Sequence, residues 1–270
     1  MQGRVLVIAG SDSGGGAGIQ ADTKAITALG GHAATAITAL TAQNTLGVQG
    51  VHGVPVAFIR EQMRVVLEDI GADCIKTGML HNAEVVEAVA AALAEFAPEI
   101  PLVLDPVMVA QGGASLLHEE AVAALHELLL PRAALITPNL PEAEALLGQP
   151  IADAGAMPEA ARALAALTPG AVLLKGGHLP GDELRDVLLA DGELHSFHQQ
   201  RLHTRAIHGT GCTLASAIAA GLAQGLALKP AVERSRAYLR AAMEHAPGLG
   251  QGHGPVGHGF CCVYPHQGKR

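Results

Sequence analysis

The chain has 270 residues, 49% of them hydrophobic, and its 17 Lys and Arg against 25 Asp and Glu give a formal net charge of −8. This length suits one large α/β domain, and the acidic balance with only 2% aromatic residues argues against a nucleic-acid partner. The sequence has no run of 18 consecutive apolar residues and four cysteines without metal-binding spacing, so we expect a soluble, reduced, cytoplasmic chain with no membrane partner.

The first apolar run, residues 5–9, predicts a buried parallel strand, which leads into a glycine-rich turn over 10–18 and a helix to about Leu29. Five glycines within nine residues favour a ligand-binding loop over a merely flexible turn. The turn has neither the Gly-Lys-Ser/Thr of a Walker A loop nor the dinucleotide spacing. A second strand over 36–45 ends in polar residues, where Gln43 either reads an aminated heteroaromatic ring or bonds neighbouring backbone.

Helices and strands alternate through the middle of the chain. Helical periodicity covers about 56–70 and 83–96, and residues 73–79 between them predict a strand and loop. The apolar strand at 101–107 carries a carboxylate at its end. Because ligands of open α/β sheets bind beyond the carboxyl ends of the strands, Asp105 is placed to hold Mg²⁺ or its water shell. The alternative is that Asp105 forms a turn at the strand end.

A helix expected over about 119–130 is followed by a fourth strand at 134–138. Asn139 then stands as N-cap with Glu142 at the third helical position, which makes a complete capping box. The same geometry sets Glu142 within range of a metal held by Asp105. The sequence supports both interpretations, and one does not exclude the other.

The next buried strand, residues 171–174, runs directly into Lys175 and two glycines. A lysine that closes an apolar strand is costly unless its charge has a partner, and phosphate is the obvious one. Residues 185–190 and 193–197 are joined by Asp-Gly and predict a hairpin with a tight turn. This hairpin would add antiparallel edge strands to a parallel sheet.

The segment 208–213, His-Gly-Thr-Gly-Cys-Thr, opens a charge-free run that predicts a helix buried on every face. Gly209 and Gly211 leave the first N–H groups uncovered, so the helix start is a ready anion site. Cys212 lies in the first turn, where a thiol's pKa is expected to be lowered. The alternative is a glycine-rich turn before a core helix that contains a small buried cysteine.

A final helix is expected over about 230–245. The stretch 248–270 is rich in Gly and His and is expected to be poorly structured, with a disordered tail at 261–270. The irregular spacing of the histidines in this stretch (His253, His258 and His266) argues against a metal site. Strands that end in polar loops with helices between them predict a doubly wound, three-layer α/β/α sheet.

These loops resemble one family, the hydroxymethylpyrimidine/phosphomethylpyrimidine kinases of thiamine biosynthesis in the ribokinase superfamily. The resemblance covers about residues 4–260, and its six segments are 9–22, 38–45, 104–108, 137–144, 175–178 and 208–213. It implies a single ribokinase-like kinase domain over 1–260 with a mostly parallel sheet, ATP and Mg²⁺ as cofactors, and a homodimer. The implied reaction phosphorylates a pyrimidine alcohol and then its monophosphate.

The resemblance also implies roles for individual residues. Gln43 matches the position that reads the aminopyrimidine edge, and the other substrate-pocket positions are Gly10, Asp22, Met79 and Val107. The nucleotide and metal positions are Asp105, Asn139, Glu142, Lys175 and Thr210, with Asp105 and Glu142 as metal ligands. Gly209, Gly211 and Cys212 match the catalytic anion hole, and Cys212 stands where most sugar kinases of the superfamily have a catalytic Asp.

The sequence departs from the family pattern at three places. Ala206 and Ile207 replace a polar Asn-Thr pair, which puts a nucleotide contact in doubt. Gln111 stands where a Lys is frequent, so a cation near the phosphates is missing. The segment from Cys261 onward has no counterpart in the family.

Three other functions compete with a pyrimidine kinase. A pyridoxine or pyridoxal kinase is the nearest, but the Thr-Ala-Gln-Asn-Thr setting of Gln43 favours the pyrimidine. A nucleotide-binding regulatory module without turnover would not need Asp105 and Cys212, and both are present. The missing dinucleotide fingerprint argues against a nicotinamide oxidoreductase.

Overall fold

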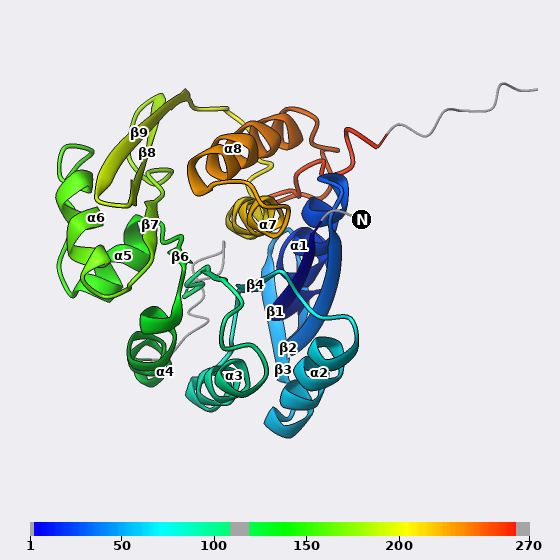
Figure 1. Cartoon of the computed structure of the whole chain (residues 1–270). Helices are drawn as coiled ribbons and strands as arrows, with labels where there is room; N and C mark the ends of the chain where they lie inside the picture. Colours follow the sequence, from blue (N-terminus) through cyan, green and yellow to red (C-terminus); the bar gives the residue numbers. More distant parts are fainter. Residues whose placement is uncertain (1–2, 109–118, 263–270) are drawn as a thin grey trace, which may run out of the picture.

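A nine-stranded sheet runs through the computed structural model, which describes residues 3–108 and 119–262 (Figure 1). The spatial order of the strands is β3-β2-β1-β4-β5-β6-β7-β8-β9. Strands β2, β1, β4, β5, β6 and β7 are parallel, whereas β3 at one edge and β8 and β9 at the other are antiparallel. Their bounds are β1 Arg4–Asp12, β2 His32–Asn44, β3 Gly47–Gly53, β4 Cys74–Thr77, β5 Leu102–Leu104, β6 Leu135–Ile136, β7 Ala171–Leu174, β8 Glu183–Ala190 and β9 Glu193–Gln200.

Helices cover both faces of the sheet, because alternate residues of each buried strand are apolar on opposite sides. Leu6 and Ile8 of β1 face the core formed with α2 to α6, whereas Val5 and Val7 face α1, α7 and α8. The helices are α1 Gly18–Ala28, α2 Val56–Asp69, α3 Ala83–Phe96, α4 Glu119–Ala124, α5 Leu140–Leu147, α6 Met157–Ala165, α7 Thr210–Ala223 and α8 Leu228–Glu244. The predicted three-layer, doubly wound α/β/α architecture is confirmed.

The order in which successive strands are added to the sheet reverses at β1, which lies between β2 and β4. Such a switch point opens a crevice at the carboxyl ends of the strands. The loops that follow β1, β4, β5, β6 and β7 therefore lie next to one another along one edge of the sheet. The N-terminus of α7 lies at the same edge, close to the residues that follow β5 and β7, since a Cβ built on Gly211 would be 3.7 Å from Asp105 Oδ2.

Several predicted boundaries were wrong. Strand β3 and helix α6 were not predicted, and the hairpin strands extend to Glu183 and Gln200. The helix expected over 119–130 is α-helical only to Ala124, continues as a π-helical turn over Leu125–Leu129 and closes with a 3₁₀ turn over Leu130–Arg132. Gln111 and His266 lie outside the described residues, as does the chain after Cys262.

The stretch from Gly248 to Cys262 is packed against the domain, contrary to the expectation of poor structure. His258 is buried, and the backbone N–H of His253 donates to Thr45 O at 2.9 Å. Cys261 and Cys262 lie exposed at the end of this stretch. Across the described residues, 3–108 and 119–262, no helix combines the length and apolar composition needed to cross a bilayer.

Candidate active site

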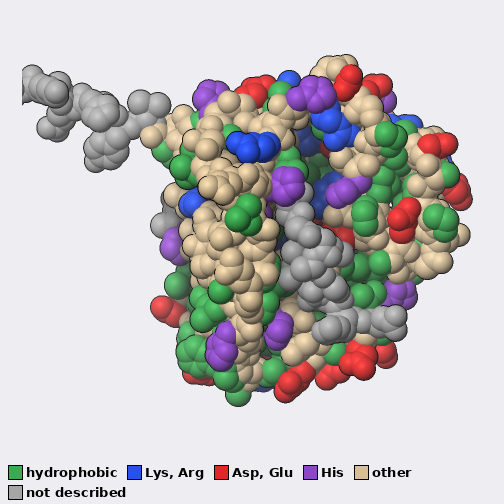
Figure 2. Space-filling view, turned by 180° about the vertical axis from the view of Figure 1, so that it is seen from behind, with side chains coloured by type: hydrophobic (Ala, Val, Ile, Leu, Met, Phe, Trp, Pro, Cys, Tyr) green, Lys and Arg blue, Asp and Glu red, His purple; other side chains and the backbone are tan. Residues whose placement is uncertain are grey.

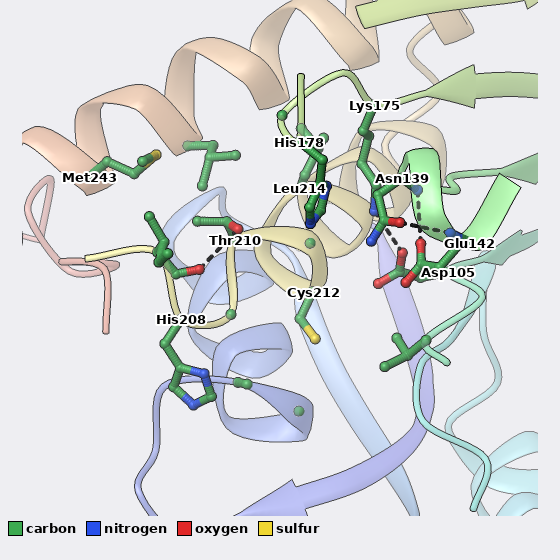
Figure 3. Close-up of a pocket in the computed structure, with 18 of the residues that line it drawn as sticks. Asp105, Asn139, Glu142, Lys175, His178, His208, Thr210, Cys212, Leu214 and Met243 are labelled. Atoms are coloured by element: carbon green, nitrogen blue, oxygen red, sulfur yellow. Dashed lines mark hydrogen bonds and ion pairs between the residues drawn. The ribbon is translucent and has the colours of Figure 1, made fainter. Parts of the chain in front are cut away.

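A cavity of about 730 Å³ opens at the carboxyl edge of the sheet and reaches from β2 to α8. It takes in loops that follow β1, β4, β5, β6 and β7 together with the start of α7 (Figure 3). All the site residues predicted from the sequence except Asp22 line this cavity: Gly10, Gln43, Met79, Asp105, Val107, Asn139, Glu142, Lys175, Gly209, Thr210, Gly211 and Cys212. Segments far apart in the sequence thus converge on one space.

The glycine-rich turn after β1 is organised around the carboxylate of Asp12. Asp12 Oδ1 accepts from Gly14 N at 2.8 Å, and Oδ2 accepts from Gly16 N at 2.9 Å and Ala17 N at 2.8 Å. His208 Nε2 lies 2.8 Å from the same Oδ2 and so joins this turn to the start of α7. Burial alone would raise the pKa of Asp12, but the hydrogen bonds from His208, Ala17 and Gly14 hold it below its usual value. Neither Asp12 nor His208 was assigned a role from the sequence, although an acidic residue two positions before a glycine is a common turn signal.

The β2 end of the cavity is formed where two pairs of strands lose their register. The β1–β2 pairing slips between Ala9 and Ser11, around Gly10, and the β2–β3 pairing slips between Ala42 and Gln43. A Cβ at Gly10 would lie 2.7 Å from Met79 Cε, so only glycine fits there without moving that side chain. The Thr41 hydroxyl lies 3.1 Å from Gln43 Oε1. If the hydroxyl donates this bond, it fixes the plane of the Gln43 amide at the cavity wall.

Helix α7 begins with a turn that only glycine can make. Gly209 is the N-cap with φ 77°, and a Cβ added there would lie 1.8 Å from Gly16 O. Thr210 and Gly211 follow, so the first N–H groups of the helix have no intrahelical acceptor. Ala206 and Ile207 are the two positions here that depart from the family pattern. Ile207 lines the cavity and its carbonyl accepts from Thr210 Oγ1 at 3.0 Å, whereas Ala206 is buried. The predicted anion-binding geometry is therefore present in spite of the two substitutions.

Two carboxylates and one ammonium group lie together beneath this helix start (Figure 3). Lys175 Nζ is 3.1 Å from Asp105 Oδ1, which also accepts from Thr137 Oγ1 at 3.0 Å. A Cβ at Gly211 would be 3.5 Å from Lys175 Nζ, so the lysine lies directly at the N-terminus of α7. Burial and the Asp105 carboxylate, opposed by the Lys175 ammonium, raise the pKa of Glu142 to about 7. The cluster thus has more negative charge than its one cation neutralises.

The capping box predicted at α5 is present. Glu142 N donates to Asn139 Oδ1 at 2.9 Å, and Asn139 N donates to Glu142 Oε2 at 2.8 Å. Glu142 also lines the cavity. The Glu142 side chain can therefore cap α5 and face a ligand in the cavity at the same time.

The expectation of a lowered thiol pKa at Cys212 was wrong. Burial raises the pKa of Cys212 to about 12, and the Lys76 ammonium does not offset it because the carboxylates of Asp22 and Asp105 add to the rise. The helix N-terminus favours an anion, but desolvation and two nearby negative charges disfavour it more. At neutral pH this side chain is a thiol.

Asp22 was predicted in the substrate pocket, yet the structure buries it completely behind the cavity wall. Its Oδ1 accepts from Lys76 Nζ at 2.8 Å and from Ser216 Oγ at 2.7 Å. Both charged side chains are 0% exposed, and within the described residues Asp22 Oδ2 has no hydrogen-bond partner. Asp22 follows the glycine-rich turn closely in sequence, but it lies on the face of α1 that packs against α7 and the sheet.

A basic rim at the other end of the cavity was not predicted. Its side chains come from the β9–α7 connection, from α8 and from the loop after β7, and they are His178, Arg201, His203, Arg236 and Arg240. Figure 2 shows Lys, Arg and His side chains gathered around this hollow. Burial and the Lys175 ammonium lower the pKa of His178. The signal for this rim was weak, because its members are scattered and only Arg236 and Arg240 share a helical spacing.

The profile of the phosphomethylpyrimidine kinase family matches residues 12–257. The thiamine biosynthesis bifunctional protein ThiED of Geobacter sulfurreducens is 52% identical over 95% of this chain, which spans about half, 52%, of that relative. The hydroxymethylpyrimidine/phosphomethylpyrimidine kinase of Haemophilus influenzae is 48% identical, with 94% of this chain and 96% of the relative covered. The crystal structure of an ADP complex of Bacillus subtilis pyridoxal kinase superposes with a TM-score of 0.87 at 34% identity, over 96% of this chain and 98% of that one. The chain belongs to the phosphomethylpyrimidine kinase family.

Proposed function

We propose that the chain is an ATP-dependent kinase that phosphorylates 4-amino-5-hydroxymethyl-2-methylpyrimidine and then its monophosphate. The observation that carries this proposal is a single cavity with a planar amide, Gln43, at one end and the glycine-rich N-terminus of α7 with Lys175 at the other. A small aminated ring and the terminal phosphates of a nucleotide can meet between them. The names of the relatives, which are 48–52% identical, support the same substrate class.

The residues of the cavity fit a magnesium ion brought in with nucleotide phosphates. Mg²⁺ prefers hard oxygen ligands and is usually held by one or two carboxylates together with waters and substrate phosphates. Asp105 and Glu142 are two such carboxylates, and the pKa of Glu142 is raised to about 7 by burial and by the neighbouring Asp105 carboxylate, so a bound cation would favour its charged form. Within residues 3–108 and 119–262 no cluster of three or more His, Cys, Asp or Glu could hold an ion alone. When bound, Mg²⁺ would neutralise charge on the transferred phosphoryl group.

The remaining catalytic work is assigned to this chain's own groups. Phosphoryl transfer depends mostly on positioning and on stabilising charge as the acceptor oxygen bonds to Pγ and the bond from Pγ to the leaving ADP oxygen breaks. The N–H groups from Thr210 to Cys212 and the Lys175 ammonium would stabilise that charge, with the N–H of Thr210 exchanging its long contact with Ile207 O, 3.4 Å, for a phosphate oxygen. Cys212, as a neutral thiol, would contact the acceptor rather than take its proton, which would pass from the hydroxymethyl oxygen to an oxygen of the transferred phosphoryl group. The basic rim would hold the nucleotide.

The protonation state of Cys212 is open to a direct test. Because its pKa is raised to about 12, the thiolate fraction should climb about tenfold for each pH unit between pH 7 and pH 10. We therefore expect the rate of Cys212 alkylation by iodoacetamide, followed by peptide mass spectrometry, to rise log-linearly without a plateau. A plateau near pH 8 would mean that the helix N-terminus does stabilise a thiolate, and would make Cys212 a candidate for the general base.

Replacing Gln43 by Glu tests the substrate end of the cavity. The change removes two N–H donors and places a charge against ring nitrogens, a loss of about 1–3 kcal/mol for an unpaired buried group. We expect KM for the pyrimidine to rise about 5- to 150-fold while KM for ATP stays within about twofold, measured by ADP release. The matched change Gln199→Glu on β9, at the opposite end of the same cavity, should leave KM for the pyrimidine unchanged. An unaltered pyrimidine KM in Gln43→Glu would remove this residue from the substrate site.

A pyridoxal kinase activity is the second candidate, because the Bacillus subtilis neighbour carries that name. The two are separated by measuring ADP release with hydroxymethylpyrimidine, its monophosphate, pyridoxine, pyridoxal and ribose as acceptors. We expect the highest kcat/KM for the two pyrimidines. A preference for the pyridine alcohols would overturn the proposed substrate and keep the reaction class.

A further inference from the structure

The segment that follows α8 runs beside the loops that form the cavity and first contacts the end of β2. His253 N donates to Thr45 O at 2.9 Å, and Gly252 N donates to Thr45 Oγ1 at 3.3 Å. A Cβ at Gly252 would lie 2.0 Å from Thr45 O, so the two backbones are in direct contact. Thr45 is two residues beyond Gln43, and the segment therefore fastens the end of the strand that carries this amide.

The same segment next reaches the turn before α7. Gly254 O accepts from His208 N at 3.2 Å, Gly254 N donates to Arg205 O at 2.9 Å, and Pro255 pairs with His208 as an isolated parallel bridge. His208 is the residue whose ring holds Asp12 in the glycine-rich turn. Residues 252–258 are thus a strap, which crosses from the end of β2 to the phosphate-binding turn.

The strap ends in a buried histidine that bonds to the first turn of α7. His258 Nε2 lies 2.8 Å from Thr213 Oγ1, and this hydroxyl donates to Gly209 O at 2.7 Å. His258 is 4% exposed and Thr213 is 0% exposed. The hydroxyl has one proton, so the tautomer with Nε2–H on His258 is the neutral form that satisfies both contacts. Burial and the Lys24 ammonium lower the pKa of His258 to about 4, which keeps the ring neutral at physiological pH.

Helix α8 holds His258 in place from behind. Tyr238 Oη donates to the backbone carbonyl of His258 at 2.9 Å, and Gly257 N donates to Ala242 O at 2.8 Å. A Cβ at Gly257 would lie 2.1 Å from His245 O, so the strap is pressed against the end of this helix. The ring is thereby presented to Thr213 from a fixed backbone.

The carbonyl of Gly209 is the point on which these contacts converge. It accepts from Thr213 N at 2.9 Å as well as from the Thr213 hydroxyl. In a planar trans peptide the C=O and the following N–H point in opposite directions, so fixing Gly209 O also fixes the N–H of Thr210. That N–H lies at the start of α7 and contacts Ile207 O at 3.4 Å, so its direction decides whether it reaches a phosphate oxygen. Gly209 has φ 77°, a left-handed conformation that glycine adopts without strain, so hydrogen bonds and the contact with Gly16 O, not backbone strain, set the orientation of this peptide.

We propose that His258 is a positioning residue for the phosphate-binding turn, acting through the Thr213 hydroxyl on the Gly209–Thr210 peptide. This inference rests on the proposed kinase function. It assigns a catalytic consequence to a segment that contributes no side chain to the reacting groups. Misorientation of one donor should cost less than outright loss of an oxyanion-hole donor, which lowers kcat by about 10²–10³-fold.

The test is steady-state ADP release by Thr213→Val and His258→Ala. We expect each to lower kcat by about 10- to 100-fold while KM for ATP and for the acceptor stays within about threefold. Both residues act through one hydroxyl. The fold-reduction of kcat in the double variant should therefore be no more than about twice that in either single variant. Thr213→Ser and His258→Gln, which keep a hydroxyl and an Nε2–H donor, should restore kcat to within about fivefold of wild type.

Ser235→Ala is the matched control. Ser235 Oγ also donates to the carbonyl four residues earlier, Ala231 O at 2.7 Å, in the buried face of α8, but it is remote from the phosphate turn. If Ser235→Ala lowers kcat as much as Thr213→Val does, the effect is a general loss of packing and the proposal is overturned. Full kcat in Thr213→Val would overturn it as well. If His258→Ala does not fold, Thr213→Val alone decides. A wild-type chain that releases no ADP with any acceptor would instead overturn the proposed function.

Discussion

Replacing Asp105 by Asn together with Glu142 by Gln is expected to lower kcat by at least about 10³-fold at millimolar Mg²⁺, the size of effect produced when a charge that acts on a transferred phosphoryl group is removed. The two carboxylates lie at the same end of the cavity as Lys175, whose Nζ is 3.1 Å from Asp105 Oδ1. Without them, Lys175 and the amides of α7 are left to hold the nucleotide phosphates. Raising Mg²⁺ should recover part of the activity, which is measured as ADP release over a magnesium series.

The capping role of Glu142 does not confuse this experiment, because Gln also accepts from Asn139 N and keeps the capping box. The pKa of Glu142 is raised in the fold from 4.5 to about 7. Ionising this side chain therefore destabilises the fold, and the loss of stability grows as the pH rises through this range. At pH 8 the Glu142→Gln single variant should therefore melt at the same temperature as wild type or higher, whereas the double variant, which leaves the Lys175 ammonium without a carboxylate partner, should melt lower. Glu144→Gln, on the same helix but outside the cavity, is the control for charge and should keep full activity. If Glu142→Gln instead melts at a much lower temperature and its residual activity depends on magnesium as in wild type, Glu142 acts only as a helix cap.

Replacing Lys76 by Met should lower the free energy of unfolding by about 3–5 kcal/mol, because it leaves the carboxylate of Asp22 buried and unpaired. Burial raises the pKa of Asp22 and opposes the charge of Lys76, but the attraction between the two groups at 2.8 Å raises the pKa of Lys76 above its usual value, so we treat the pair as ionic in the fold. Replacing both partners, Lys76→Met with Asp22→Leu, removes the desolvation cost along with the attraction. The double variant should recover most of the loss.

Urea unfolding followed by circular dichroism measures these differences. Lys229→Met, an exposed lysine near the start of α8, is the control and should change the free energy of unfolding by less than about 0.5 kcal/mol. A single variant that unfolds like wild type would mean that Asp22 takes up a proton at little cost. A double variant as unstable as the single one would mean that packing around this site, and not charge, determines the stability.

The carboxyl ends of the strands were the most predictable part of the site. Asp105 and Lys175 follow short apolar runs, and the rule that ligands bind beyond the carboxyl ends of parallel strands identified both without any tertiary information. Gly209 was predictable for the same local reason, since a glycine before an apolar helix indicates a tight turn. Each of these signals lies within ten residues of the group it identifies.

The features that sequence reasoning missed depend on contacts between distant segments. Strand β3, Gly47–Gly53, has three glycines and little alternation, and it becomes a strand because β2 offers it an edge. The pKa of Cys212 depends on Asp22 and Asp105, which come from different parts of the chain. The glycines of residues 248–262 suggested disorder, yet Gly252 and Gly257 are needed where the strap touches other backbones.

The contact between Asp12 and His208 bears on when, during synthesis, the active site can form. The two residues are 196 positions apart in the chain. A ribosome-bound chain that has emerged only as far as α6 contains Gln43 and both carboxylates, but neither the turn for phosphate nor the histidine that holds the glycine-rich loop. Contacts of such long range form late, because the entropy of closing a large loop is lost before they are gained. Phosphoryl transfer at this site therefore requires α7, which follows all nine strands in the chain.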